Sequence, residues 1–275
     1  MPTDAPAPAD DPADSPADEL PELLVDLAEG VLTLTMNRPE AMNAMSGAMS
    51  LRLAEELEGA RGRDDVRVVV LTGAGGAFSA GADIGGAGAH ERFDVRSMDI
   101  ANRIVRAIVE CPKPVVAAVD GIAAGVSCGA ALAADLVVAS ERAAFLLPFA
   151  KIGFMPDGGT TASVAASIGR ARAMRMALLA EPMPAAEAYA LGLVSHLADA
   201  DSYEATVASV VRKLGRGAPL AQTATKKAVN TATLPGWHDA LERERTGQVV
   251  LMRTADVAEG MAAFNERRPP VFRGE

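Results

Sequence analysis

The pattern of apolar and polar positions in the first quarter of the chain predicts alternating strands and helices. Residues 20–35 contain two apolar runs, LLVDLA and VLTLTM, which predict two short strands joined by a turn at Glu29 and Gly30. Pro39 ends the second strand, because proline removes a donor from a sheet ladder. Residues 46–60 have apolar residues at helical spacing behind an N-cap at Ser46. A β-branched strand over residues 66–72 completes a mixed α/β order.

A largely apolar stretch follows between residues 113 and 160. Residues 115–119 predict a buried strand, residues 127–136 a tightly packed helix of small side chains, and residues 136–139 a second strand. A turn, PDGG, then precedes another helix. Backbone N–H groups are freed where a glycine-rich loop enters a helix, and they can hold developing negative charge. Asp157 is the polar group expected to face them.

The last third of the chain predicts helices. Residues 204–214, 220–230, 238–252 and 257–266 each carry apolar residues three and four positions apart. Their clustered charges predict solvated helix faces.

Composition narrows the classes of partner. The chain has 275 residues, 49% of them hydrophobic and only 4% aromatic, so small side chains must fill much of the core. A net charge of −10 argues against a nucleic-acid partner. The two cysteines, Cys111 and Cys128, lie in apolar surroundings without metal-ligand spacing, and we expect them to be reduced core residues of a cytoplasmic protein.

The first 19 residues differ from the rest of the chain. They are rich in Pro, Ala and Asp and lack both apolar periodicity and the basic and apolar regions of a signal peptide. We therefore expect a disordered tail over residues 1–19. No run of about 18 uncharged apolar residues occurs, so no membrane association is expected.

Residues 73–86 form a glycine-rich stretch after the strand at 66–72. A dinucleotide fingerprint fails because Phe78 stands where its third glycine belongs, and the P-loop pattern fails because no Gly-Lys-Ser/Thr follows. A surface loop is one interpretation. The other is an ordered backbone, anchored by Phe78 and Ile84, that a ligand can approach closely.

Several motifs together resemble the crotonase, or enoyl-CoA hydratase/isomerase, family. They are NRPEAMNAMS at 37–46, AFSAGADI at 77–84, KPVVAAVDGIAAG at 113–125, GFMPDGGT at 153–160 and EGMAAFNERRPPVF at 259–272. The resemblance implies an α/β superhelix of ββα units over residues 20–200. It also implies a C-terminal helical region, residues 201–275, that builds a homotrimer or a dimer of trimers. The implied ligand is an acyl-CoA thioester, with no separate cofactor and no metal.

The resemblance also implies positions for the site. The amides of Ala82 and Val126 would form an oxyanion hole for the thioester oxygen, although the family usually has glycine at the second position. Other residues are expected around coenzyme A, namely Ala41, Ala80, Asp83 and Ile84, with Lys227 and Phe264 where the ligand of an adjacent subunit would lie. Phe149, Phe154 and Met155 would line the acyl pocket.

Two residues depart from the hydratase pattern. Gly129 and Phe149 stand where hydratases of the family carry glutamates, so the two groups needed to add water are missing. Moving a double bond needs only one base and an oxyanion hole. Asp157 matches the aspartate of phenylacetate-pathway isomerases such as ring-1,2-epoxyphenylacetyl-CoA isomerase. We therefore expect an enoyl-CoA isomerase with Asp157 as its base.

Other functions stay open from the sequence. A family label of enoyl-CoA hydratase is compatible with the motifs, and so is an acyl-CoA-binding protein without catalysis. Residues 125–129 also match the G-x-S-x-G nucleophile elbow of hydrolases, with Ser127 as nucleophile. Against a hydrolase, the preceding strand ends several residues before Ser127, whereas an elbow turns directly off its strand. Taken alone, Asp157 before two glycines is also typical of a turn or an N-cap.

Overall fold

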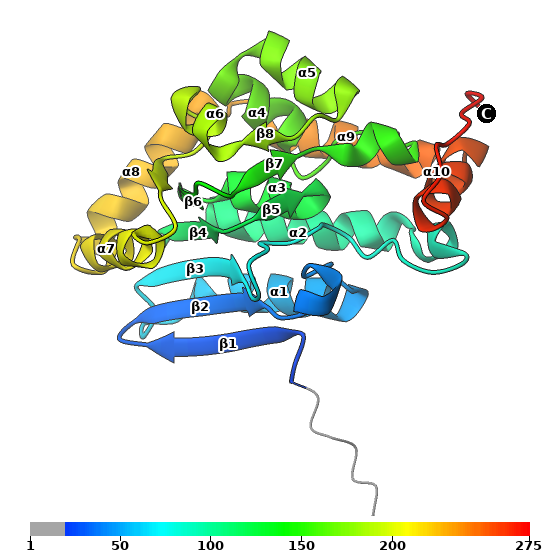
Figure 1. Ribbon diagram of the computed structural model, residues 1–275. Coiled ribbons are helices and arrows are strands. Elements are labelled where there is room, and N and C mark those ends of the chain that lie inside the picture. Colours follow the sequence, from blue (N-terminus) through cyan, green and yellow to red (C-terminus); the bar gives the residue numbers. More distant parts are fainter. Residues whose placement is uncertain (1–19) are drawn as a thin grey trace, which may run out of the picture.

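The computed structural model describes residues 20–275, so the tail predicted over residues 1–19 lies outside the described residues. A six-stranded sheet has the order β1-β2-β3-β4-β6-β9, and a three-stranded sheet has the order β5-β7-β8 (Figure 1). The strands are β1 Leu23–Ala28, β2 Val31–Met36, β3 Val68–Gly73, β4 Val115–Val119, β5 Ile122–Ala124, β6 Leu136–Ser140, β7 Ala144–Leu146, β8 Met183–Pro184 and β9 His196–Ala198.

Helices connect the strands and make up most of residues 203–265. They are α1 Gly47–Ala60, α2 Val95–Glu110, α3 Gly125–Ala133, α4 Thr160–Ile168, α5 Arg170–Leu179, α6 Ala185–Ala190, α7 Tyr203–Gly215, α8 Pro219–Thr233, α9 Trp237–Leu251 and α10 Ala255–Asn265. Three short 3-10 helices are η1 Pro39–Ala41, η2 Ala89–Arg92 and η3 Pro148–Ile152.

The first two strands form the predicted hairpin. β1 and β2 pair antiparallel, with Leu23 opposite Met36 and Ala28 opposite Val31. Glu29 and Gly30 both have positive φ, 51° and 79°, which is the twist that a two-residue hairpin turn requires. From β2 onward, all neighbours in the large sheet are parallel.

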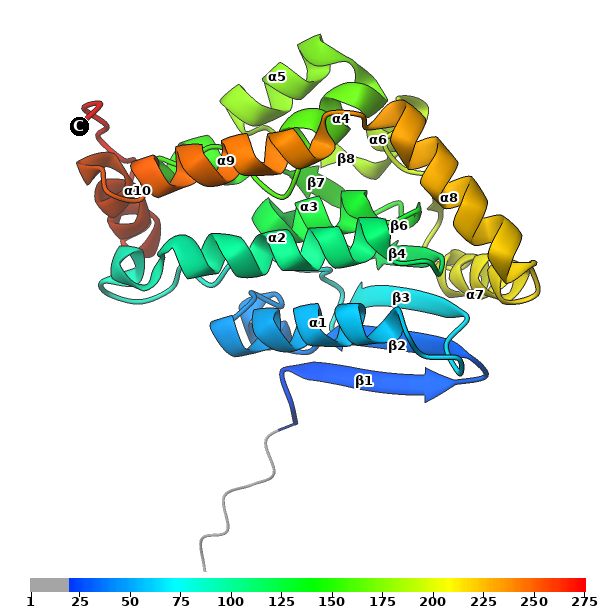
Figure 2. The same cartoon turned by 180° about the vertical axis from the view of Figure 1, so that it is seen from behind.

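Strand β4 is buried at all five positions because helices cover both faces of the sheet. On one face, Val115, Ala117 and Val119 join the main core with side chains of α1 and α2, which lie together against the sheet (Figure 2). On the other face, Val116 and Ala118 pack with Val210 and Val211 of α7. The continuous apolar run of this strand follows from that double burial.

Of two helix predictions, the structure confirms one and corrects the bounds of the other. Ser46 caps α1 as predicted, because its Oγ accepts a hydrogen bond from the Met49 amide at 3.0 Å. The small-residue helix predicted over 127–136 is wrong in its bounds, since α3 spans Gly125–Ala133. The helix ends earlier than predicted because Asp135 is bound elsewhere. Its carboxylate accepts a hydrogen bond from the Val115 amide at 2.7 Å and forms an ion pair with Lys226 at 2.8 Å. These bonds tie residue 135 to β4 instead.

The four predicted C-terminal helices are present as α7 to α10. Helix α9 lies along α2 (Figure 2), where Arg245 pairs with Asp99 at 2.7 Å and Glu242 pairs with Arg106 at 2.8 Å. The last third of the chain therefore returns to the core. Within residues 20–275, no helix combines the length and the apolar composition needed to cross a membrane.

Candidate active site

The glycine-rich stretch at 73–86 is an ordered backbone held from both sides. Phe78 is fully buried and anchors it. On one side, the Ser79 amide donates to Ile122 and the Ala124 amide donates to Ser79, both at 2.9 Å. On the other side, the Met45 amide donates to Gly81 at 2.7 Å and the Asp83 amide donates to Met45 at 3.0 Å. These bonds do not use the amide of Ala82, which lies between Gly81 and Asp83.

Asn43 holds the start of this stretch. Its Oδ1 accepts the Arg38 amide at 2.9 Å, and its Nδ2 donates to the carbonyls of Ala74 and Ala77, both at 2.8 Å. Asn43 has a φ of 55°, a left-handed conformation that asparagine tolerates better than most residues. The motif at 37–46 therefore serves as a template for the glycine-rich stretch.

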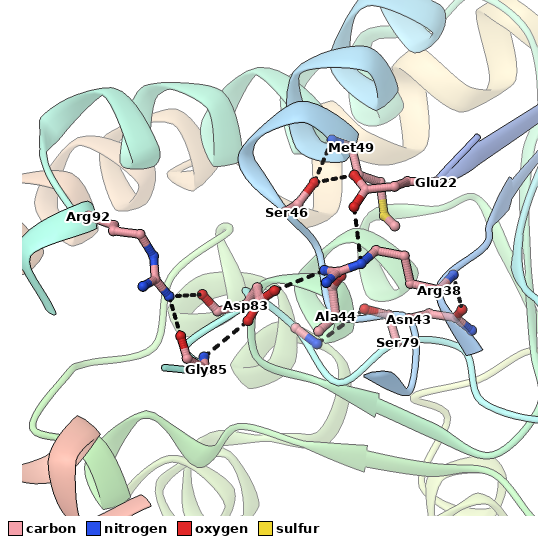
Figure 3. A network of polar contacts seen from close by, with 11 residues as sticks. Glu22, Arg38, Asn43, Ala44, Ser46, Met49, Ser79, Asp83, Gly85 and Arg92 are labelled. Atoms are coloured by element: carbon pink, nitrogen blue, oxygen red, sulfur yellow. Dashed lines mark hydrogen bonds and ion pairs between the residues drawn. The ribbon is translucent and has the colours of Figure 1, made fainter. Parts of the chain in front are cut away.

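Charged side chains fasten the same region (Figure 3). Arg38 bridges Asp83 at 2.9 Å and Glu22 at 3.1 Å, and it donates to the Ala44 carbonyl at 2.7 Å. The other oxygen of Asp83 accepts the Gly85 amide at 3.0 Å. Both oxygens of Asp83 thus stabilise the loop that carries this residue.

A second amide comes from the start of α3. Val126 lies in the first turn of that helix, where backbone N–H groups lack intrahelical partners. Gly125 has a φ of 57°, and Gly81 packs beside it: a Cβ added to Gly81 would lie 2.7 Å from the Ala124 carbonyl oxygen and 3.5 Å from the Gly125 Cα. The amides of Ala82 and Val126 are therefore carried by adjacent backbones.

Both residues line a cavity of about 630 Å³. Its wall is mostly apolar and includes Ala80, Ile84, Phe93, Met98, Ile104, Phe149, Phe154 and Met252, and its polar members include Ser46, Ser50, Ser97, Arg92 and Gln248. Phe93 and Phe154 pack edge to face with ring centroids 6.3 Å apart. Of the described residues that line it, only Asp83 and Asp157 carry carboxylates.

Asp157 lies on the turn before α4 and is buried, with 6% of its surface exposed. Its Oδ2 accepts a hydrogen bond from Gln248 Nε2 at 3.1 Å, whereas its Oδ1 is buried without a partner among residues 20–275. Burial raises the pKa of Asp157 to about 7; the Gln248 hydrogen bond opposes this rise and the charge of Glu244 adds to it. At neutral pH this carboxyl group can therefore both accept and return a proton.

Several other expected residues lie away from the cavity. Met155 does not line it, because its sulfur packs against Gly247 of α9. Ala41 is in η1, and Lys227 and Phe264 are exposed on α8 and α10; none of these three lines the cavity either. In the described chain, no group of three or more His, Cys, Asp or Glu residues is placed to hold a metal ion.

The structure does not support Ser127 as a nucleophile. The side chain is fully buried, and its hydroxyl lies 2.8 Å from the Ser79 carbonyl and 2.7 Å from the Ala124 carbonyl. The Ser127 hydroxyl thus donates its hydrogen to a backbone carbonyl. No histidine is among the hydrogen-bond partners of Ser127 in residues 20–275.

Comparison with known proteins decides the family. The model of the family described as enoyl-CoA hydratase/isomerase matches residues 26–275. The chain belongs to this family. A crystal structure of an enoyl-CoA hydratase from Mycobacterium avium subsp. paratuberculosis is 46% identical and superposes with a TM-score of 0.87, covering 93% of this chain and all of the other.

Relatives within the enoyl-CoA hydratase/isomerase family carry different names. A protein of Rhodobacter capsulatus named "Probable enoyl-CoA hydratase" is 40% identical over 251 residues, 90% of this chain and 96% of the relative. The 1,2-epoxyphenylacetyl-CoA isomerase of Escherichia coli is 34% identical over 258 residues, 92% and 98% respectively. Family membership therefore establishes an acyl-CoA-processing enzyme, and the site must indicate the reaction.

Of the two positions expected to carry hydratase glutamates, Gly129 packs against the turn that carries Asp157 and Phe149 lines the cavity. A Cβ on Gly129 would lie 3.4 Å from Thr160 Cγ2 and 3.5 Å from the Gly158 Cα, beside Asp157. Phe149 presents an aromatic side chain to the cavity. Gln248, which donates a hydrogen bond to Asp157, was not predicted from the sequence. It reaches Asp157 only because α9 packs back against the core.

The close approach at Gly81 gives a test of the loop. We expect Gly81→Ala to lower the free energy of unfolding by about 2 kcal/mol more than Gly76→Ala, measured by urea denaturation. Gly76 is the matched control, since it also has positive φ (80° against 93°) but a Cβ there would have no neighbour within 4 Å. Equal losses for the two variants would contradict the contact with Ala124.

The raised pKa of Asp157 gives a pH-dependent test of stability. The native state keeps this proton up to a pH of about 7, whereas the unfolded chain releases it near 3.8, so the stability contribution of Asp157 falls as pH rises through this window. The interval from 3.8 to about 7 corresponds to about 4 kcal/mol at most. We expect Asp157→Asn to unfold at a higher temperature than the wild type at pH about 8.5, and at a similar temperature at pH about 4. A difference in melting temperature that does not change with pH would contradict a buried carboxyl group of raised pKa.

Proposed function

We propose that this enzyme is an enoyl-CoA isomerase that moves a double bond, with Asp157 as its single base. One observation carries the proposal: among residues 20–275, Asp157 is the one carboxylate of the cavity that is not engaged in an ion pair, and it is buried with a pKa of about 7. A base of that strength is suited to a carbon acid activated by a thioester. The Escherichia coli relative is likewise named as an isomerase of an acyl-CoA.

The reaction would begin with a 3-enoyl thioester in the cavity. Asp157 takes a proton from C2, and the electrons of that C–H bond form a dienolate whose negative charge extends to the thioester oxygen. The amides of Ala82 and Val126 donate to this oxygen, and each such donor contributes roughly 3 kcal/mol to stabilising a developing oxyanion. The protonated Asp157 then returns the proton at C4, leaving the double bond between C2 and C3 conjugated with the thioester.

Hydration is the second candidate, because relatives carry hydratase names. Adding water requires one group to activate the water and another to handle the proton at C2. The cavity offers Asp157, while Asp83 is held by Arg38 and Gly85. The apolar wall around Phe149 also provides little to orient a water molecule. These features favour isomerisation over hydration.

We expect Asp157→Asn to lower kcat for a 3-enoyl-CoA about 1,000-fold while the dissociation constant for a saturated acyl-CoA stays within about threefold. The amide keeps the shape of the carboxylate but cannot take the proton. Conversion of 3-enoyl-CoA to 2-enoyl-CoA, with hydration assayed in parallel, measures the effect. Asp99→Asn serves as the control, because Asp99 pairs with Arg245 at the surface. An Asp157→Asn enzyme with most of its rate would refute the assigned base.

The pH profile is a separate prediction. Only ionised Asp157 can accept the proton, so kcat/KM for a 3-enoyl-CoA should rise about tenfold per pH unit below its pKa of about 7 and level off above it. Stopped assays between about pH 5 and pH 9 measure this acid limb. A flat profile over that range would indicate a carboxylate of ordinary pKa or a different base.

A further inference from the structure

Two side chains of α9 reach the turn that carries Asp157. Glu244 and Gln248 are one helical turn apart, so they project from the same side of the helix. Both are almost fully buried, at 0% and 1% exposure. Together they contact the backbone from Met155 to Thr161.

Gln248 uses both ends of its amide on this turn. Its Oε1 accepts the Met155 amide at 3.2 Å, and its Nε2 donates to the Met155 carbonyl at 2.8 Å and to Asp157 Oδ2 at 3.1 Å. A primary amide has two N–H donors, so both donated bonds can exist at once. Rotation of the Gln248 amide would break all three bonds, which leaves Oδ2 of Asp157 in one orientation.

Glu244 holds the other end of the turn. Its two oxygens accept the Gly159 amide at 2.7 Å and the Thr161 amide at 3.0 Å, with a further bond from the Thr161 hydroxyl. Gly159 is the N-cap residue of α4 and has no side chain to cap the helix, so Glu244 supplies the acceptor from α9. A carboxylate is also favoured at a helix N-terminus.

The first residue of α9, Trp237, holds the same turn. Trp237 packs so tightly on Gly159 that a Cβ added there would lie 2.0 Å from the indole Nε1. Gly159 has a φ of 78°, which suits glycine. The turn is therefore held at three points of one helix, Trp237, Glu244 and Gln248.

We propose that Gln248 is a positioning residue for Asp157, occupying Oδ2 so that Oδ1 is the oxygen that exchanges the proton, and that Glu244 supplies the fixed negative charge beside this base. The proposal rests on Asp157 being the base of the isomerase. Oδ1 is the one oxygen of Asp157 without a partner in the described chain, as the assignment requires.

Most other charged groups on the elements around this turn are paired or exposed, and the charge of Arg243, exposed on α9, lowers the pKa of Glu244. On α9 and α2, Arg245 pairs with Asp99 and Glu242 pairs with Arg106. Helix α4 carries no charged residue, and the one titratable group of α3 is the fully buried thiol of Cys128, whose pKa burial raises to about 12. On α10, Asp256 accepts the amides of Arg273 and Gly274, and on η3 Lys151 is exposed. Gln248 and Glu244 are thus the two side chains that act on the pKa of Asp157 besides its burial.

The two side chains have opposite effects on Asp157. The hydrogen bond from Gln248 stabilises the ionised carboxylate and lowers its pKa, whereas the charge of Glu244 raises it. Burial raises the pKa of Glu244 itself, and the hydrogen bonds from Thr161 and Gly159 oppose that rise. Removing each group should therefore move the acid limb of the reaction in opposite directions, which a purely structural role would not do.

The experiment compares Gln248→Met and Glu244→Gln in the full-length enzyme with a 3-enoyl-CoA. We expect Gln248→Met to lower kcat about 10- to 100-fold, with little change in KM, and to move the acid limb up by about one pH unit. Glu244→Gln should move the acid limb down. Gln222→Met is the matched control, because Gln222 donates to the Leu214 carbonyl on the far side of the C-terminal region and should leave both quantities unchanged.

A second measurement separates this inference from the proposed function. Carbon-13 NMR titration of the Asp157 carboxyl, assigned by its loss in Asp157→Asn, should show the same opposite pKa changes without substrate. An active Asp157→Asn enzyme would refute the proposed function. The titration would still show whether Gln248 and Glu244 act on the pKa of Asp157. An inactive Asp157→Asn enzyme combined with unshifted profiles and titrations in both α9 variants would refute the inference. If Gln248→Met does not fold, Gln248→Glu keeps the length and the acceptor for Met155, and it should also move the titration of Asp157 upward.

Discussion

The site depends on how the backbone of residues 79–83 is paired. Parallel bonds to β5 on one side and to residues 42–45 on the other use the N–H groups of Ser79, Ala80 and Asp83. A buried N–H without a partner is costly, so a pairing that does not use the amide of the cavity-lining Ala82 is stable only if the neighbouring bonds are strong and numerous. Asn43 and the Arg38 ion pairs supply that support from a segment far away in the sequence. The backbones that carry the amides of Ala82 and Val126 are thus held against each other, which is the arrangement that the proposed oxyanion hole requires.

The chemistry adds a second constraint, because a buried carboxyl group opposes folding at the pH where it is useful. Desolvation raises the pKa of Asp157 to about 7, and above that pH the native state must carry a buried negative charge. The fold tolerates this cost because α9 fixes the turn with neutral and charged acceptors and donors. The stability that α9 contributes to the turn offsets part of the free-energy cost of burying this carboxyl group. This is the usual relation between a reactive site and the scaffold that supports it.

The sequence predicted those features that depend on local pattern. The hairpin at Glu29 and Gly30, the Ser46 cap and the buried strand β4 follow from turn, capping and periodicity rules, and the structure confirms them. The end of the helix predicted at 127–136 could not be found in this way, because Asp135 is bound by Lys226, which is 91 residues away. The same limit applies to the site: Gln248 is 91 residues from Asp157, and Met155 faces Gly247 instead of the cavity. Motif comparison located Asp157, but the partners that tune it come from tertiary packing.

The role of α9 changes how the division of the chain should be understood. The region after residue 200 was expected to serve association between subunits, and the positions of Lys227 and Phe264 remain predictions of that kind. Helix α9 also lies along α2 of its own chain and places Gln248 in the wall of the cavity (Figure 2). A change in how the last helices pack would therefore alter the orientation of Asp157 and the volume available to the acyl group together. In this enzyme the C-terminal region therefore forms part of the candidate active site as well as part of the surface.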